Sequence, residues 1–350
     1  MACNPYQNLP SSSFWKTGVT QESPYAIDGI YAKKFDILPS TKIAAAGSCF
    51  AQHISRHLKA NGYNVLDVEP PPPGLPASKH QRFGYSMYSG RYGNIYTVRQ
   101  LLQLAQEVAG EWSPQDYIWE KGGRFFDGLR PAVEPDGLES KQEVVEHRAY
   151  HVARLRELFQ SFDLFIFTLG LTEMWVHKES GTVYPTAPGA IAGDFKPESY
   201  YFENASFGSI NSDFRQFLKT MRKLRSKPFN LLLTVSPVPL TATASGKHVL
   251  VSTVHSKSVL RTIASVWSER DFIDYFPSYE IVTNPRLHST SYQDNLRSIR
   301  PEAVDNVMSH FFRQHPKLNT AKQAHKDDRD EAASLSDVQC EEALIQAFGK

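Results

Sequence analysis

The chain has 350 residues, of which 41% are hydrophobic and 21% are charged, and 38 Lys and Arg nearly balance 37 Asp and Glu. This composition is typical of a globular protein with a large core. The formal net charge of +1 gives no electrostatic reason to expect nucleic acid or another polyanion as a partner.

The cysteines and the apolar runs indicate in which cellular compartment the protein is expected. The three cysteines, Cys3, Cys49 and Cys340, are too widely spaced for a disulfide framework or a C-x-x-C metal motif. The N-terminal residues lack the apolar region of a signal peptide, and no apolar run approaches the roughly 18 residues of a membrane-spanning helix. We therefore expect a cytoplasmic protein with no membrane span.

Five short apolar runs predict β-strands, and two of them are apolar almost throughout, as central strands buried on both faces are. The runs are Lys42–Ala46, Asn64–Val68, Leu164–Leu169, Asn230–Val235 and Phe272–Phe276. Amphipathic helix patterns lie between them, with capping boxes at Thr97-x-x-Gln100 and Ser140-x-x-Glu143, and with Pro301 beginning the last helix. Strands that alternate with helices predict a parallel sheet in a three-layer α/β/α sandwich.

Composition divides the chain into three parts. We expect an N-terminal extension over residues 1–41, one α/β domain over residues 42–315, and a charged linker with a short C-terminal helix over residues 316–350. Within the domain, Gly170–Ser209 is rich in proline, glycine and aromatic residues, which predicts a long lid-like insertion.

In open parallel sheets, ligands bind beyond the carboxyl ends of the strands. There the first strand runs into Gly47-Ser48-Cys49, where a helix begins and supplies free backbone N–H groups. Those groups would stabilise an oxyanion beside the Ser48 hydroxyl, and Gly47 would leave the approach of substrate open. Two alternatives stay open: Ser48 only caps the helix, or Cys49 is the nucleophile.

The string GSCFA at residues 47–51, followed by Gln52 and His53, resembles the GSCFA family, which is named for it. Further strings similar to that family run in order along residues 42–312: RYGNIYT from Arg91, TLGLTEMW from Thr168, TVSPVPL from Thr234, SKSVLR from Ser256 and YFPSYE from Tyr275. The family is in turn similar to the SGNH/GDSL hydrolases, esterases and acyltransferases with an α/β/α, flavodoxin-like sandwich. The resemblance implies that fold, and it implies an acylated sugar or polysaccharide precursor as substrate.

The resemblance also implies roles for individual residues. It makes Ser48 the nucleophile and Gly93 the glycine of the oxyanion hole. In the hydrolases' third block, Gly170 matches, but Thr172 stands where an asparagine amide is expected, so Asn94 is an alternative donor.

The final block departs further from the hydrolases. Their Asp-x-x-His becomes Asp294-Asn295-Leu296-Arg297, and a guanidinium cannot accept a proton near neutral pH. Either another histidine is the base or the site binds without hydrolysing. Arg297 itself is expected to bind a substrate carboxylate or phosphate, or to pair with Asp294 or Glu173.

Several side chains are candidates for the missing base. We rank His53 first because it follows the GSCFA string, and His255 second because it follows the fourth strand. Glu173 would orient such a histidine, or act as the base if burial raises its pKa. His288, just before Asp294, and His151, on a helix face, are further histidines for which we expect a non-catalytic role.

We expect an O-acyl hydrolase or O-acyltransferase with Ser48, His53, Glu173 and Asp294 as catalytic residues. The expected substrate-binding residues are Gly93, Asn94, Gly170, Thr172, His255 and Arg297. The alternative is a non-catalytic carbohydrate-binding module on the same fold. No phosphate-binding loop or metal signature is present, so no cofactor is expected, although a transferase could take an acyl thioester as donor.

Overall fold

The computed structural model describes residues 4–318, 345, 348 and 349. Its centre is a parallel four-stranded sheet with the strand order β1-β4-β8-β9. The strands are β1 (Ile43–Gly47), β4 (Leu164–Leu169), β8 (Asn230–Val235) and β9 (Ile273–Tyr275). Four of the five predicted strands are therefore confirmed: β4 and β8 have the predicted bounds, and β1 and β9 differ from them by one residue at each end.

Helices cover both faces of this sheet, because successive strand residues face opposite sides. On one face Ala44, Phe165 and Leu231 lie in a core shared with four helices. These helices are α3 (Val98–Ala109), α4 (Lys141–Ser161), α5 (Phe207–Leu224) and α6 (Val249–Trp267).

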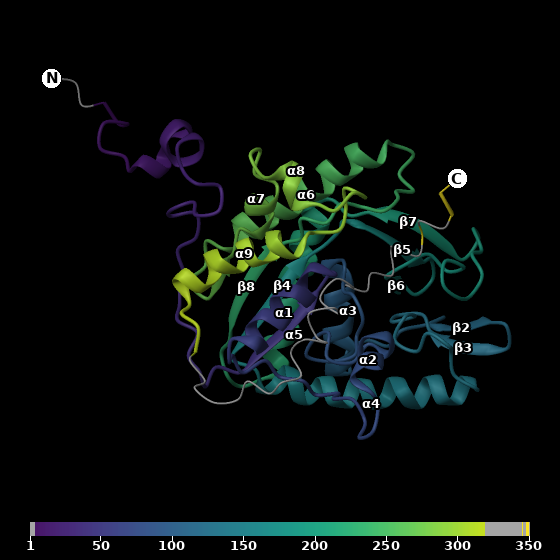
Figure 1. Ribbon diagram of the computed structural model, residues 1–350. Helices are drawn as coiled ribbons and strands as arrows, with labels where there is room; N and C mark the ends of the chain where they lie inside the picture. The colour runs from purple at the N-terminus through teal and green to yellow at the C-terminus, as the bar shows by residue number, and fades with distance from the viewer. Residues whose placement is uncertain (1–3, 319–344, 346–347, 350) are drawn as a thin grey trace.

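On the other face Ile43, Ile166 and Leu232 lie in a second core. The helices in contact with that core are α1 (Phe50–Ala60), α7 (Ser278–Val282) and α9 (Pro301–Gln314). Figure 1 shows α1 and α9 on the near side of the sheet and α5 behind it. The α/β fold with helices on both faces of a parallel sheet is thus confirmed.

The predicted strand Asn64–Val68 is wrong as a strand. Only an isolated parallel bridge joins Val65 to Ile43. Further along β1 the edge is taken by another segment, since Ser89 N–H donates to Ala45 O and Ile95 N–H donates to Gly47 O. With Val65 beside β1, the spatial order of the segments is 2-1-3-4-5, which places a topological switch point between β1 and β4.

The insertion over Gly170–Ser209 is not a structureless loop. It contains an antiparallel sheet of the order β6-β5-β7, built from β5 (Glu173–His177), β6 (Val183–Tyr184) and β7 (Tyr200–Asn204). A separate hairpin that the sequence interpretation missed is formed by β2 (Ile118–Lys121) and β3 (Arg124–Asp127). Three short helices complete the described secondary structure of the domain: α2 (Ala77–His80), α8 (His288–Ser291) and a 3-10 turn at Gln81–Phe83.

One of the two predicted capping boxes is formed in full. The Thr97 side chain accepts from Gln100 N–H, and the Gln100 side chain accepts from Thr97 N–H, so the capping box at the start of α3 is confirmed. Ser140 caps α4 by accepting from Glu143 N–H, but the Glu143 carboxylate accepts from Glu139 N–H rather than from Ser140 N–H, so only half of the second box is confirmed. Pro301 is the first residue of α9, as expected.

The N-terminal segment is anchored to the sheet end of the domain. This segment begins with two short helical turns, at Ser11–Ser13 and Lys16–Thr20. Farther on, Tyr31 is buried and its hydroxyl donates to Asp274 at 3.0 Å. Beyond residue 318, the predicted linker and C-terminal helix lie outside the described residues, apart from residues 345, 348 and 349.

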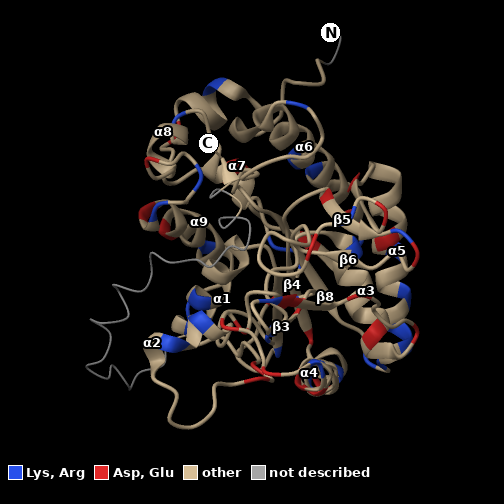
Figure 2. Cartoon of the chain, turned by 90° about the vertical axis from the view of Figure 1, so that its right-hand side faces the viewer, with Lys and Arg blue, Asp and Glu red and all other residues tan. Residues whose placement is uncertain are grey.

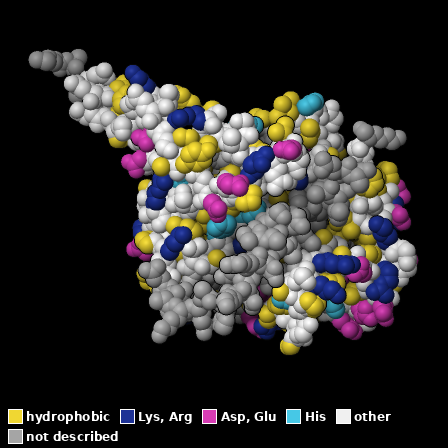
Figure 3. Space-filling view, viewed as in Figure 1, with side chains coloured by type: hydrophobic (Ala, Val, Ile, Leu, Met, Phe, Trp, Pro, Cys, Tyr) yellow, Lys and Arg dark blue, Asp and Glu magenta, His cyan; other side chains and the backbone are white. Residues whose placement is uncertain are grey.

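The surface carries both signs of charge. Basic and acidic residues are interspersed along the helices (Figure 2), and on the face shown in Figure 3 hydrophobic side chains lie scattered among them. None of the described helices combines the length and the apolar character that are needed to cross a bilayer.

Candidate active site

Ser48 lies directly beyond the carboxyl end of β1, at the switch point of the sheet. Its side chain is 3% exposed, and its hydroxyl has no hydrogen-bond partner among the described residues. The residue that precedes α1 is Cys49, and neither it nor Ser48 caps the helix through a side-chain hydrogen bond. The capping alternative is therefore wrong, because the Ser48 hydroxyl is not used by the helix.

Two glycines shape the floor beneath Ser48. A Cβ on Gly170 would lie 2.8 Å from the Ser48 Cβ and 3.0 Å from Tyr96 O, so only glycine fits there. Gly47 has φ +140°, and a Cβ on it would lie 2.5 Å from Thr168 O. Gly47 is thus needed for the close approach of β1 to β4 rather than for open access of substrate, which corrects the expectation from sequence.

The loop over residues 91–97 forms one wall of the site. Ile95 N–H donates to Gly47 O at 2.9 Å, and Tyr96 O accepts from both Gly170 N–H and Leu171 N–H. Gly93 and Asn94 are buried in this loop. The structure therefore brings Ser48, Gly170 and this loop together, as the resemblance implied.

The Asn94 side chain is oriented by its neighbours. Its Oδ1 accepts from Tyr88 OH at 2.5 Å and from Gln52 Nε2 at 3.4 Å. Since the two ends of an amide point in different directions, the Asn94 nitrogen is turned away from Tyr88. The Asn94 oxygen is thus held toward Tyr88 and Gln52.

Two other expected oxyanion donors are already engaged. The Thr172 hydroxyl donates to Asn204 Oδ1 at 2.6 Å, and Thr172 N–H donates to Ser256 Oγ at 3.0 Å. Ser48 N–H donates to Thr168 O at 3.2 Å. Thr172 thus acts in the structure as a brace for the loop after β4, and an oxyanion role would require these bonds to change.

His53 is not placed as a base for Ser48. It lies on α1, its ring packs against Phe50 with centroids 5.7 Å apart, and burial together with Arg56 and His57 lowers its pKa to about 3. A histidine with this pKa is a weak base near neutral pH. No hydrogen bond joins it to Ser48 among the described residues.

Glu173 and His255 lie near each other, away from His53. The Glu173 carboxylate accepts from the Thr243 hydroxyl at 2.7 Å. Burial raises the Glu173 pKa, while the Thr243 hydrogen bond and the exposed His255 act in the opposite direction. Glu173 is thus a partly buried carboxyl held toward the loop that precedes α6.

The segment at residues 293–300 places its two candidates differently. Asp294 is fully exposed and pairs with Arg300 at 3.1 Å, so its carboxylate is directed to solvent. Arg297 is half-buried, and its Nε donates to Pro239 O at 3.2 Å in the loop after β8. Of the pair, only Arg297 reaches the carboxyl edge of the sheet.

Sequence reasoning missed two neighbouring residues of α6 that contact the site. Lys257 is 1% exposed and its Nζ donates to Gly170 O at 2.8 Å. Ser256 is fully buried and accepts from Thr172 N–H. Both belong to the string SKSVLR, which resembled the family but received no role. Beside them, Tyr96, Leu171 and Leu240 form a small buried apolar cluster.

A network of buried charges holds the loop over residues 91–97 from behind. Glu69 Oε2 accepts from Arg91 N–H at 2.6 Å and lies 2.7 Å from His151 Nδ1, while Arg130 donates to Arg91 O at 3.1 Å. Farther from the loop, the guanidinium of Arg148 pairs with further carboxylates. His151 is thus a satisfied core histidine, as weighed from the sequence.

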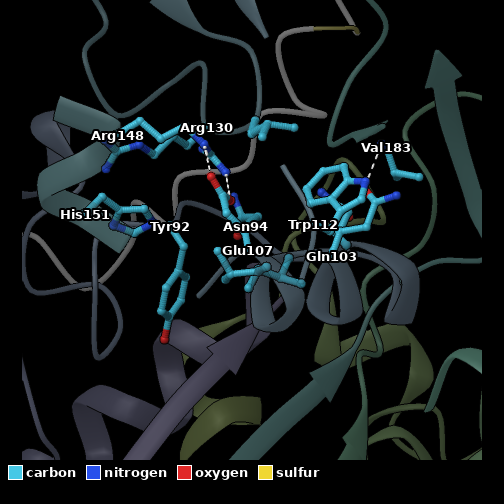
Figure 4. A pocket seen from close by; sticks show the side chains of 13 residues that line it. Tyr92, Asn94, Gln103, Glu107, Trp112, Arg130, Arg148, His151 and Val183 are labelled. Atoms are coloured by element: carbon cyan, nitrogen blue, oxygen red, sulfur yellow. Dashed lines mark hydrogen bonds and ion pairs between the residues drawn. The ribbon is translucent and has the colours of Figure 1, made fainter. Parts of the chain in front are cut away.

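These groups line a small cavity of about 40 Å³, enough for a few water molecules. Figure 4 shows Arg148 and His151 entering it from one side and Gln103 and Trp112 from the other, with Tyr92 and Asn94 between them. The cavity therefore lies behind the loop that carries Asn94, and its walls combine charged side chains with apolar ones such as Leu104 and Val183.

The network predicts that acid destabilises the protein. Burial, with Arg130, lowers the His151 pKa to about 4 against the opposing Glu69, and burial of Glu69 is outweighed by His151 and Arg130, which bring its pKa to about 2. Both folded-state values lie below the unfolded ones, so the unfolded chain binds more protons and stability falls as the pH is lowered. We expect the free energy of unfolding, measured with urea, to fall by about 2 kcal/mol or more between pH 6.5 and pH 4. A flat profile over that range would contradict this placement of His151.

No cluster of three or more His, Cys, Asp or Glu side chains suited to a metal ion occurs among the described residues. Cys49, next to Ser48, is 5% exposed and forms no disulfide.

Comparison with known proteins gives one match. The GSCFA family is matched over residues 42–311, which is most of the chain. No curated protein and no solved structure matches.

Proposed function

The chain belongs to the GSCFA family, and from that premise we propose that it is an acyl-ester enzyme that uses Ser48 as its nucleophile. The reaction is O-acyl hydrolysis or O-acyl transfer, and the substrate is an acylated carbohydrate or polysaccharide precursor. The substrate class comes from the resemblance to the SGNH/GDSL hydrolases, and the protein is proposed to act in the cytoplasm.

One observation carries the proposal: the Ser48 hydroxyl is buried at the switch point of the sheet without a hydrogen-bond partner among the described residues. Leaving a buried hydroxyl unsatisfied costs about 1–3 kcal/mol, so native proteins seldom do so without a reason. Ser55 shares this feature, so it is the place of Ser48 at the carboxyl end of β1 that favours a nucleophile awaiting an ester carbonyl. Gly170 supports this reading because it brings backbone, and no side chain, against Ser48.

The chemistry runs in two halves. Ser48 Oγ attacks the acyl carbon, and the carbonyl oxygen becomes an oxyanion that needs hydrogen-bond donors. Asn94 and the backbone of Gly93 are the proposed donors, since Thr172 donates elsewhere. The sugar hydroxyl leaves, and the acyl-serine then passes to water or to an acceptor hydroxyl. Water exclusion would favour transfer.

Covalent trapping tests the proposal. The full chain is incubated with a fluorophosphonate, digested, and mapped by tandem mass spectrometry. We expect one adduct, on Ser48, with the adjacent Cys49 unmodified. An adduct on Cys49 would support a thiol enzyme instead, and absence of any adduct from the peptide that contains both residues would contradict a serine enzyme.

The second candidate is a carbohydrate-binding module without catalysis. It is favoured by the engagement of the Ser48 N–H and the Thr172 hydroxyl, and by Arg297 at the position expected for a histidine. Glycan-array binding together with a negative trapping result would select it over the enzyme.

A further inference from the structure

Lys257 is a buried lysine on the face of α6 that packs against the core. It is 1% exposed and ranks among the largest fully buried side chains of the described residues. The side chains that follow it on the same helix face are Leu260, Ile263, Ala264 and Trp267, all buried. A buried lysine is kept in place by polar contacts rather than by packing alone, so the groups around its amine indicate its role.

The contacts of Lys257 lead to the candidate nucleophile. Its Nζ lies 2.8 Å from Gly170 O. Gly170 in turn is the residue whose Cβ, if present, would lie 2.8 Å from the Ser48 Cβ. Lys257 and Ser48 thus lie against the same glycine. Ser256 fixes the same loop through Thr172 N–H at 3.0 Å, so this turn of α6 is docked on the site.

The other candidates for a base are less suitable. Arg297 cannot give up its proton, and the Glu173 carboxylate accepts from Thr243. The ring of His53 packs on Phe50. The Lys257 amine, in contrast, lies against the glycine that contacts Ser48, and neutral lysine amines serve as general bases. Serine–lysine pairs are an established alternative to serine–histidine pairs.

We propose that Lys257 is the general base for Ser48, directly or through one water molecule; this rests on the proposed acyl-ester function. The neutral amine takes the Ser48 hydroxyl proton as the bond from Oγ to the acyl carbon forms. The resulting ammonium gives that proton to the departing alkoxide as the ester C–O bond breaks. In the second half, the amine takes a proton from water or the acceptor hydroxyl, and returns it to Ser48 Oγ when the acyl–Oγ bond breaks.

Substitution at Lys257 tests the proposal with an aryl acetate as probe. We expect Lys257→Met to lower kcat by about 10²-fold or more, the lower range for general-base catalysis, with KM within about threefold of wild type. Lys257→Arg keeps the charge but cannot accept a proton, so it should be equally impaired. Lys247→Met, which removes an exposed lysine just before α6, should leave kcat unchanged.

The pH profile separates a base from a structural brace. In wild type, kcat should rise with pH, and Lys257→Met should abolish this rise. The base role would be overturned if Lys257→Met lowered kcat equally at every pH, or if Lys257→Arg restored kcat. If the variants fail to fold, the wild-type Lys257 ¹³Cε shift is followed against pH by NMR. An amine that stays protonated through the rising limb would also overturn the proposal. Absence of any Ser48-dependent turnover in wild type would instead defeat the proposed function itself.

Discussion

Replacement of Ser48 with alanine is expected to lower kcat/KM for an aryl acetate by about 10³-fold or more, to the limit of detection. Removal of a catalytic serine leaves only the residual rate that oxyanion binding provides. The fold should be unaffected, because the Ser48 hydroxyl has no partner among the described residues whose bond would be lost. Stopped hydrolysis with an unchanged unfolding midpoint in urea is the expected pair of results.

Ser55 offers a matched control for this experiment. It lies on α1, the helix that follows β1. Its hydroxyl is likewise buried without a partner among the described residues. Ser55→Ala should keep full activity. Cys49→Ser distinguishes the thiol alternative, since it would abolish turnover only if Cys49 were the nucleophile. Equal rates for wild type and Ser48→Ala would reject the serine enzyme.

The central sheet could be predicted because strands that are buried on both faces consist almost entirely of apolar residues. Leu164–Leu169 and Asn230–Val235 are apolar almost throughout, and both are central strands in the structure. Ser48 and Gly170 could be placed together for a related reason: the carboxyl ends of parallel strands share one edge. The Thr97 capping box depended only on residues three apart, so it too could be predicted.

The insertion and the second strand depended on long-range pairing that single segments do not encode. Asn64–Val68 has a strand-like composition, but the loop that contains Ser89 and Ile95 takes the β1 edge instead. The hairpin of β2 and β3 did leave a signal. Gly122 and Gly123 both have positive φ, and a Gly-Gly pair between β-type segments is typical of a tight hairpin turn.

Lys257 could also have been noticed in the sequence, because it is a charged residue at a position where the helical pattern expects an apolar one. It stands three residues before Leu260 and seven before Ala264, which places it on the buried stripe of α6. A lysine in that stripe is an exception to the pattern, and such exceptions tend to mark functional sites. The charges at Glu69, Arg91 and His151 could not be grouped, because they lie far apart in sequence and meet only through the fold.

Gly47→Ala is expected to destabilise the protein by about 3 kcal/mol or more, even though it adds only one methyl group. Two effects combine at this position. The backbone φ of +140° is strained for any residue with a Cβ, which costs about 1–3 kcal/mol. The added Cβ would also lie 2.5 Å from Thr168 O and 2.7 Å from Thr168 N, backbone atoms of a central strand that cannot turn aside.

Gly74→Ala separates the two effects, because Gly74 has φ +89° and nothing within 4 Å of an added Cβ. That variant should lose only the strain contribution, about 1–2 kcal/mol. The difference between the two variants, measured by urea unfolding, then reports how closely β1 approaches β4 at the point where Ser48 begins. Similar losses for both would mean that the strands have room at Gly47, and that Ser48 is not held against Gly170 by the packing described above.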